Sequence, residues 1–538
     1  MRTFTFKGLF LTVVFMLLGC LSIQAANDDL ITKQITIKLD EAGTLPDRIG
    51  ASKKYLITNL KIIGKINGTD WKMIREMAGR DYENNKTAGK LSMLDLSEAK
   101  IVKGGDRYFS GYYSGDNCYT SNDEIGEYAF KDCSRLTSLT LPAGITSIGY
   151  AAFNGCDGLT SLTLPAGITS IGRSTFEGCR GLTSLTLPAG ITSIGDYAFY
   201  GCDGLTSLTL PAGITSISNG AFWCCDGLTS LTLPAGITSI GSSAFAGCSG
   251  LTSLTLPAGI TSIGDNAFDC CHGLTSINLP SSITSIGKSA FAYCSRLTSL
   301  TLPAGITSIS DKAFYGCSRL TSLTLPAGIT SIGSSAFWCC SRLTSLTLPA
   351  TITSISDNAF YGCSGLTSLT LPAGMTSIGE SAFEGCSGLT SLTLPAWITS
   401  IGSRAFEGCS GLTSLTLPAG TTSIDFGAIE CFSGLTSIYV YAEKVPKMGS
   451  DVFYYVDKKN CTLYVPQGTE TDYFLADVWG DFENIVEFDA TGIDKTTTST
   501  DVEEVSRYSV NGQRLVGPTK GLNIVKYSDG SVKKVAVQ

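Results

Sequence analysis

Cysteine recurs at a fixed interval of 23 residues through the middle of this chain. Thirteen cysteines obey the period without a break, at positions 133, 156, 179, 202, 225, 248, 271, 294, 317, 340, 363, 386 and 409. A fixed period of this length is typical of solenoids, in which one unit cannot bury its own apolar side and stacking of neighbours completes the core. The period therefore predicts one extended array rather than a single globular core.

The consensus unit predicts the path of one coil. It reads C-x-x-L-T-S-L-T-L-P-A-G-I-T-S-I-G-x-x-A-F-x-G. Leu139 and Leu141 alternate with polar residues, which indicates a short strand with one buried face, and the proline that follows ends it. The apolar spacing over 149–156 predicts a short helix or 3₁₀ turn. The expected core consists of Leu136, Leu139, Leu141, Ile145, Ile148, Phe153, Cys156 and their equivalents.

These residues carry a family resemblance. L-x-x-L-x-L, as in Leu136, Leu139 and Leu141, is the strand signature of leucine-rich repeats. The longer pattern L-x-x-L-x-L-P-x-x-I-x-x-I-x-x-x-A-F-x-x-C, matched from about Ile125 to Leu435, resembles the 23-residue class of BspA-like surface proteins of Bacteroidetes and a treponemal relative. The resemblance implies a curved repeat solenoid with a parallel β-sheet and short helical turns, and a non-catalytic binding role at the cell surface.

Segments on either side of the array resemble the end caps of the same family. Residues 60–79 predict a strand up to Ile66 and a helix that Thr69 caps, with Trp71, Ile74 and Met77 buried. Residues 462–488 predict a strand and an amphipathic helix. Caps of mixed α/β structure are expected because a solenoid needs both ends shielded to stay soluble.

The domain organisation follows from these segments and from changes in composition. The expected order is a signal peptide at 1–25, an N-terminal cap at 26–90, the solenoid at 91–435 with an insertion at 104–123, a C-terminal cap at 436–488, a polar linker at 489–506 and a small β tail at 507–538. The tail resembles the C-terminal sorting modules of Bacteroidetes secreted proteins. Its Asn511-Gly512 and Asp529-Gly530 pairs predict two hairpins.

The N-terminus predicts export. Arg2 and Lys7 precede an apolar run that is too short to span a bilayer, and small residues suited to cleavage after Ala25 follow it. In the alternative reading, "LLGC" resembles a lipobox and Cys20 bears a lipid. Either route places the protein outside the cell, secreted or on the cell surface in association with the outer membrane. A lipid anchor or the sorting tail would provide its contact with a membrane.

Composition argues against nucleic-acid binding and against catalysis. The net charge is −8, whereas nucleic acid attracts basic surfaces. Two interpretations of Cys271 and His272 compete: a nucleophilic or zinc site, and a histidine that simply faces solvent. Zinc would need four ligands, and His272 is the single histidine of the chain. Sequence motifs for phosphate binding are absent. We expect no enzyme, no metal and no cofactor.

The periodic cysteines are expected to be buried reduced thiols. Cysteine packs as a small hydrophobe, and disulfide geometry between stacked coils would be demanding. Cross-linked neighbours are the alternative, because exported proteins often form disulfides. Four further cysteines, Cys224, Cys270, Cys339 and Cys431, each stand just before a periodic position and lie too many coils apart to bridge one another.

Two sets of aromatic residues are the candidate ligand-binding sites. The insertion carries Tyr108, Phe109, Tyr112, Tyr113 and Tyr119, which either form an exposed binding loop or pack on the first coil and seal its edge. The position after A-F carries Tyr200, Trp223, Tyr315, Trp338 and Tyr361, which form either a binding row or neutral variation on a tolerant turn. The uniform Thr/Ser strand face ranks third, because identical units cannot distinguish positions along a ligand.

Three functions compete. The family resemblance implies an adhesive module that holds host extracellular-matrix proteins, other cells or glycans. A structural stalk without a specific ligand is the second possibility. Ice or crystal binding by the regular Ser/Thr grid is the third. The sequence does not name the ligand or the oligomeric state.

Overall fold

A computed structural model describes residues 30–111, 117–490, 504–509, 514–516, 520–527 and 532–537. The predicted signal peptide, Cys20, Tyr112, Tyr113 and both predicted hairpin turns of the tail lie outside the described residues. The chain divides into two compact units. Unit 1 comprises residues 1–351 and 359–364, and unit 2 comprises 352–358 and 365–538.

Unit 1 opens with a cap built from strands and helices. Its elements are β1 (Ile35–Leu39), α2 (Leu45–Arg48), β2 (Asn59–Ile66) and α3 (Gly68–Met77). As predicted, α3 buries Trp71, Ile74 and Met77. The predicted cap residue is wrong. Asn67, rather than Thr69, caps the helix, because its side chain accepts the Thr69 N–H while the Asp70 carboxylate accepts the Asn67 N–H.

The cap joins the repeats through continuous parallel pairing. Strand β3 (Met93–Ile101) pairs with β2 on one side and with β7 of the first coil on the other, so the segment "LSMLDL" serves as the strand before the first regular unit. Beyond β3, the insertion forms an antiparallel pair from β4 (Gly104–Ser110) and β5 (Asn117–Thr120). The Trp71 indole N–H and the Arg75 guanidinium donate to the carbonyl of Ala129 on the first coil. The cap thus supplies hydrogen-bond donors to a backbone carbonyl at the end of the array.

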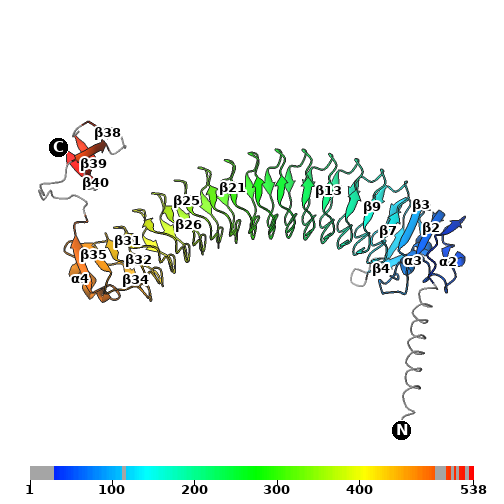
Figure 1. Cartoon of the computed structure of the whole chain (residues 1–538), viewed down its shortest axis with the longest axis horizontal. Helices are drawn as coiled ribbons and strands as arrows, with labels where there is room; N and C mark the ends of the chain where they lie inside the picture. Colours follow the sequence, from blue (N-terminus) through cyan, green and yellow to red (C-terminus); the bar gives the residue numbers. More distant parts are fainter. Residues whose placement is uncertain are drawn as a thin grey trace, which may run out of the picture. The chain divides into compact units, whose positions relative to one another are not determined.

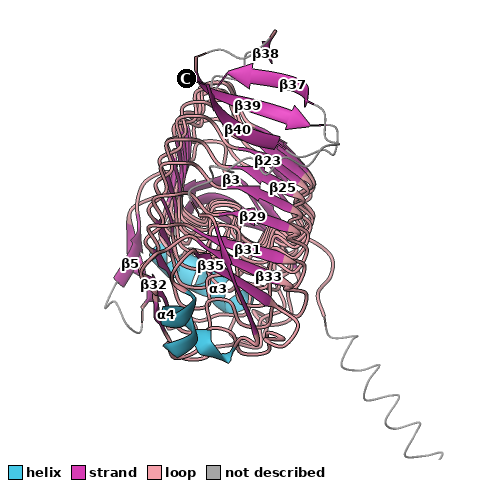
Figure 2. Ribbon diagram, turned by 90° about the vertical axis from the view of Figure 1, so that its left-hand side faces the viewer, coloured by secondary structure: helices cyan, strands magenta, loops and turns pink. Residues whose placement is uncertain are grey.

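Each coil contributes two short strands, which pair in parallel with the equivalent strands of neighbouring coils. Figures 1 and 2 show how the coils stack. The first strands of unit 1 are β7 Ser138–Thr140, β9 Ser161–Thr163, β11 Ser184–Thr186, β13 Ser207–Thr209, β15 Ser230–Thr232, β17 Ser253–Thr255, β19 Ser276–Asn278, β21 Ser299–Thr301, β23 Ser322–Thr324 and β25 Ser345–Thr347. The second strands are β6 Glu124–Ile125, β8 Ser147–Ile148, β10 Ser170–Ile171, β12 Ser193–Ile194, β14 Ser216–Ile217, β16 Ser239–Ile240, β18 Ser262–Ile263, β20 Ser285–Ile286, β22 Ser308–Ile309 and β24 Ser331–Ile332. Equivalent residues pair across coils, as Ser184 with Ser161.

The segment 149–156 forms a series of tight turns, so the predicted helix is wrong, and the alternative of a 3₁₀ turn holds only in that alternate N–H groups bond three residues back. Alternate N–H groups donate to the next coil: Ala151 to the Arg173 carbonyl, Phe153 to Thr175 and Gly155 to Glu177. The N–H groups between them close tight turns three residues back, as Phe153 carbonyl accepts from Cys156. A left-handed backbone at Ala151 (φ +50°) and Gly155 (φ +70°) prevents helical continuation.

The left-handed position before each ladder cysteine explains the consensus glycine. Glycine adopts a positive φ without steric cost, and it fills this position in most coils, as at Gly155 and Gly178. Cys224, Cys270, Cys339 and Cys431 occupy the same position with φ between +53° and +63°. These four cysteines therefore replace glycine in the repeat and are not members of the buried row.

The predicted core is confirmed. Leu136, Leu139, Leu141, Ile145, Ile148, Phe153 and Cys156 are each at most 6% exposed. The phenylalanines stack in a continuous column from Phe130 to Phe360, with centroids 5.2–5.8 Å apart and planes within 11°. Trp71 of the cap contacts Phe130 at 5.2 Å and so covers the first ring of the column. One apolar core therefore runs through the coils of unit 1.

Unit 2 contains coils of the same kind and a cap. Its repeat strands are β26 Ser354–Ile355, β27 Ser368–Thr370, β28 Ser377–Ile378, β29 Ser391–Thr393, β30 Ser400–Ile401, β31 Ser414–Leu417, β32 Ser423–Ile424, β33 Ser437–Val440 and β34 Lys447–Met448. The cap follows with β35 (Thr462–Pro466), α4 (Glu470–Leu475), the 3₁₀ helix η1 (Trp479–Asp481) and β36 (Asn484–Phe488). Strands β31, β33, β35 and β36 form one parallel sheet.

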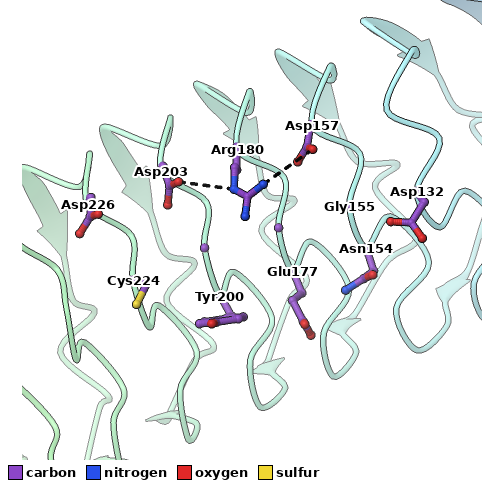
Figure 3. Close-up of a pocket in the computed structure, with 12 residues that line it drawn as sticks. Asp132, Asn154, Gly155, Asp157, Glu177, Arg180, Tyr200, Asp203, Cys224 and Asp226 are labelled. Atoms are coloured by element: carbon purple, nitrogen blue, oxygen red, sulfur yellow. Dashed lines mark ion pairs between the residues drawn. The ribbon is translucent and has the colours of Figure 1, made fainter.

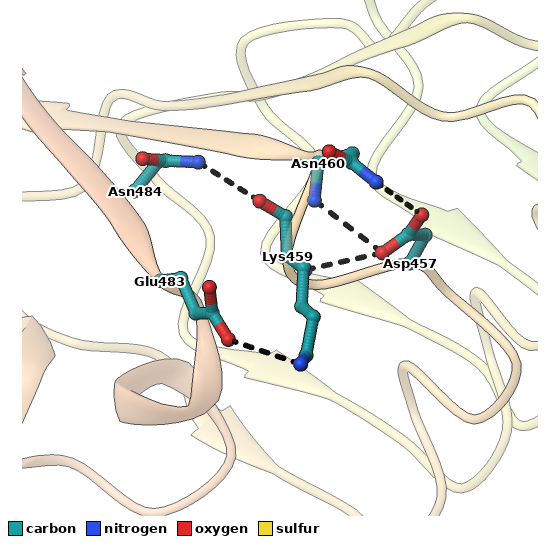
Figure 4. Close-up of polar contacts among 5 residues, drawn as sticks. All are labelled: Asp457, Lys459, Asn460, Glu483 and Asn484. Atoms are coloured by element: carbon teal, nitrogen blue, oxygen red, sulfur yellow. Dashed lines mark hydrogen bonds and ion pairs between the residues drawn. The ribbon is translucent and has the colours of Figure 1, made fainter.

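Side-chain contacts fix the loop that enters the last cap (Figure 4). The Asp457 carboxylate accepts hydrogen bonds from the Asn460 amide side chain and from the Lys459 and Asn460 backbone N–H groups. The Asn484 side chain donates to the Lys459 carbonyl, and the Lys459 ammonium lies 3.7 Å from Glu483. These contacts connect the loop to β36, the edge strand that ends the parallel sheet.

The tail is a separate antiparallel sheet in the order β38-β37-β39-β40. Its strands are β37 (Glu504–Ser509), β38 (Arg514–Leu515), β39 (Gly521–Tyr527) and β40 (Val532–Val537). Strand β37 begins before residue 507, the expected start of the tail.

Candidate binding faces

The strand face is uniform from coil to coil. It consists of Thr137, Ser138, Thr140 and their equivalents, which are exposed except for the half-buried Thr416. Its first threonines donate their hydroxyls within the protein, as Thr183 Oγ1 does to the Thr160 carbonyl at 3.0 Å. Such a surface presents methyl groups and oxygen atoms without charge. A uniform face offers no feature by which a partner could select one coil over another.

Variation gathers on a second surface, which we call the turn face. It consists of the two residues before each ladder cysteine and the two residues after it. We number the coils 1 to 13 by their ladder cysteines, from Cys133 to Cys409, and assign each turn-face residue to the coil of its cysteine. The turn tolerates substitution because backbone N–H and carbonyl groups hold it to the next coil whatever the side chain is.

In coils 1–5 the turn face is acidic (Figure 3). Asp157, Asp203 and Asp226 stand in a row and are exposed. Arg180 lies between the first two, 4.0 Å from Asp157 and 3.7 Å from Asp203. Partial burial and the nearby Asp226 carboxylate raise the pKa of Asp203. Together with Asp132 and Glu177 they line a shallow groove of about 440 Å³, in which carboxylates outnumber the single guanidinium.

In coils 8–10 the same turn is basic. Arg296, Arg319 and Arg342 occupy the second position after the ladder cysteine in three consecutive coils, and all three are exposed. None of them forms an ion pair with a carboxylate within the described part of the chain. Lys288 and Lys312 belong to the same stretch, whose one acid, Asp311, pairs with Lys288 at 3.1 Å.

The predicted aromatic row exists as two clusters. In coils 4 and 5, Tyr200 and Trp223 lie 5.2 Å apart and both contact Tyr197, a residue that the sequence analysis missed. In coils 9–11, Trp338 stacks on Tyr315 at 5.6 Å and on Tyr361 at 3.8 Å. Tyr293 of coil 8 extends the second cluster, 5.2 Å from Tyr315. Small or acidic residues separate the two clusters at Ala246, Asp269 and Ala292.

Only some of the aromatic residues predicted as a binding site in the insertion are exposed. Tyr108 is 1% and Phe109 4% exposed, so for these two residues the alternative of packing holds and that of an exposed binding loop does not. Tyr108 lies 6.3 Å from Trp71 and donates its hydroxyl to the Glu127 carbonyl, while Phe109 stacks on Tyr128 at 4.5 Å. They pack against the cap and first coil, whereas Tyr119 is 54% exposed.

The cysteine geometry does not resemble a nucleophilic site. Cys271 is buried and donates its thiol to the Phe245 carbonyl, while His272 is exposed and contacts the Tyr293 carbonyl through Nδ1. Burial raises the pKa of the Cys179 thiol to about 12, so this ladder thiol remains protonated near neutral pH. No cluster of three or more His, Cys, Asp or Glu side chains suited to a metal ion occurs among the described residues.

The charged rows were missed in the sequence, although a signal was present. The string C-S-R-L occurs in three consecutive units at 294, 317 and 340, and C-D-G-L occurs at 156, 202 and 225. Both fall on positions that the consensus treats as variable. Tyr197 and Tyr293 were missed because they stand outside the position after A-F.

Fold and surface together define a class: a leucine-rich-repeat solenoid with a uniform strand face and a variable turn face. Residues 123–250, 215–344 and 330–460 match the family described as BspA type Leucine rich repeat region, which covers more than half of the chain. The chain belongs to this family.

Solved structures resemble the chain as well. A leucine-rich repeat protein from Bacteroides ovatus is 33% identical, covering 60% of this chain and 83% of its own, with a TM-score of 0.56. A leucine rich cell surface protein from Faecalibacterium prausnitzii is 31% identical over 60% of this chain and 85% of its own, with a TM-score of 0.40. The T. pallidum leucine-rich repeat protein is 29% identical over 34% and 78%, with a TM-score of 0.28. No curated protein matches the chain.

Proposed function

We propose that the chain is an exported, non-catalytic module that attaches the cell surface to host matrix proteins, other cells or glycans through its turn face. The observation that carries the proposal is that the coils differ in sequence mainly on the turn face. Exposed Trp223 and Tyr293 and the charged rows all lie on the turn face, whereas the strand face repeats almost unchanged. Aromatic and arginine side chains are enriched at binding hot spots. Membership of the BspA-type family supports a role in protein interaction rather than catalysis.

We further propose that the N-terminal segment directs export and that the β tail serves in surface sorting. The apolar run with its basic start supports cleavage after Ala25, and Cys20 keeps the alternative of a lipid anchor open. None of the helices in the described residues has the length and hydropathy needed to cross a bilayer. Mass spectrometry of the exported protein separates the two routes, because lipidation leaves an acylated Cys20 as the first residue and cleavage leaves Ala26.

Binding should depend on the turn-face aromatics. The Trp223→Ala, Trp338→Ala double variant is expected to lose affinity for immobilised extracellular-matrix extract by about tenfold or more, because each substitution removes a large ring, exposed at Trp223 and half-buried at Trp338, from an aromatic cluster. Surface plasmon resonance of the full exported chain measures this effect. A Thr183→Lys, Thr206→Lys variant on the strand face is the matched control and should bind as the wild type does. Circular dichroism must first show that both variants fold.

Two other outcomes would contradict the proposal. If the strand-face variant loses binding while the tryptophan variant retains it, the uniform face is the site. If the wild type binds neither the matrix extract nor cells, the stalk interpretation replaces the adhesive one. A Tyr119→Ala variant tests the remaining exposed aromatic residue of the insertion in the same assay.

A further inference from the structure

We infer that one partner of the turn face is a second copy of this chain, bound antiparallel. This inference rests on the proposed function, in that it takes the turn face as the binding surface, and it names the partner. The acidic row in coils 2–5 and the basic row in coils 8–10 lie in one unit on equivalent turns. Each row is therefore available to the opposite row of another molecule.

The spacing of the two rows makes them complementary. Arginine occurs once per coil in coils 8–10, aspartate occurs once per coil in coils 4 and 5, and the coil spacing is set everywhere by the same parallel pairing between strands. Asp203 and Asp226 thus repeat at the same interval as Arg296 and Arg319, so one matched pair brings the other into register. An isologous contact through the same face, with its two-fold axis perpendicular to the stacking direction, reverses one solenoid and places the acidic row against the basic one.

One position of the two-fold axis brings aspartates opposite arginines and, at the same time, aromatic rings opposite aromatic rings. With the axis between coils 6 and 7, coil 5 meets coil 8 and coil 4 meets coil 9. Asp226 then faces Arg296, and Asp203 faces Arg319. Partial burial contributes most to the raised pKa of Asp203, and the Asp226 carboxylate adds a repulsion that a guanidinium would relieve. Because the axis relates both copies, each of these pairs forms twice.

The aromatic clusters coincide under the same axis. Trp223 of coil 5 comes opposite Tyr293 of coil 8, and Tyr200 of coil 4 comes opposite Tyr315 of coil 9. Trp223 and Tyr293 are among the exposed large side chains of the unit, 37% and 46% exposed. Their burial supplies apolar area that surface ion pairs alone do not provide, because exposed ion pairs contribute little.

One pairing in this register is unfavourable. Coil 3 meets coil 10, which brings Arg180 towards Arg342. Arg180 is already compensated by Asp157 and Asp203, and Glu177 stands on the same turn of coil 3. We therefore expect a weak dimer, and an Arg342→Ser variant should associate more tightly than the wild type.

Charge reversal tests the inference on the full exported chain by sedimentation velocity at low ionic strength. The wild type is expected to dimerise and to dissociate in about 0.5 M salt, which screens charges beyond a few ångströms. Arg296→Glu with Arg319→Glu, and separately Asp203→Arg with Asp226→Arg, should each lower the association constant by about 100-fold, because like charges then oppose each other. An equimolar mixture of the two variants should recover a dimer.

Arg135→Glu is the matched control, because Arg135 is an exposed arginine at the same repeat position in coil 1, outside both rows. It should dimerise as the wild type does. A wild type that stays monomeric at about 100 μM in low salt, reversed variants that still dimerise, or a mixture that stays monomeric would each overturn the inference. Loss of self-association with retained matrix binding would leave the proposed function standing, whereas loss of matrix binding with an intact dimer would remove that function alone.

Discussion

Raising the pH above about 9 is expected to destabilise the solenoid steeply. Burial raises the pKa of Cys133 to about 11 and that of Cys179 and Cys317 to about 12, while an unfolded thiol titrates near 8.5. Below the unfolded pKa both states keep the proton, and the stabilisation is fully present. Between about pH 9 and 12 the unfolded chain loses protons that the folded chain retains, so stability falls by up to about 1.4 kcal/mol per pH unit for each buried thiol.

Urea denaturation under reducing conditions at a series of pH values measures this effect. Lysines and tyrosines also titrate in this range, so a variant with Cys202, Cys225 and Cys248 changed to Ala is the control. It has a lower starting stability because of lost packing, yet its stability should decline with a shallower slope. Equal slopes for the variant and the wild type would show that the cysteine ladder does not govern the alkaline transition.

A second large effect is expected from Leu139→Asp. Leu139 is 6% exposed in β7, whose neighbours are β3 and β9, and aspartate there buries a carboxylate without a partner. The expected loss is about 3–5 kcal/mol in the free energy of unfolding. Since coils contact mainly their neighbours, hydrogen exchange should show local opening around coil 1 while distant coils stay protected.

Ser138→Asp is the control for this substitution. Ser138 belongs to the same strand but is exposed, so its change should alter stability by less than about 0.5 kcal/mol. Comparable losses in the two variants would mean that β7 does not have the inward and outward faces assigned to it.

The coil core could be predicted from the sequence because burial in a repeat follows the period. Leu139, Ile145 and Phe153 recur every 23 residues, and all are buried. The turn over 149–156 could not be predicted in the same way. Its apolar spacing fits a helix, and only the hydrogen bonds to the next coil show that alternate N–H groups are used elsewhere. The glycine before each ladder cysteine was the available sign of a left-handed turn.

The candidate surface was only partly predictable, because a pattern identifies variable positions without saying which of them meet. Trp338 and Tyr361 were predicted as members of a row and do stack. Tyr108 and Phe109 are in a glycine-containing insertion for which the sequence left both exposure and packing open, and their rings fill the space beside Trp71 and Tyr128. The separation of acidic and basic turns became visible once each variable position had been assigned to a coil.

The measurement that tests the central claim most directly is hydrogen exchange on the full exported chain with and without bound extracellular-matrix extract. If the turn face is the binding surface, added protection should appear in the peptides that contain Trp223 and Trp338. The strand peptides between them, such as 229–233, should be unchanged. Protection confined to the strand peptides, with no change in the turns, would contradict the account.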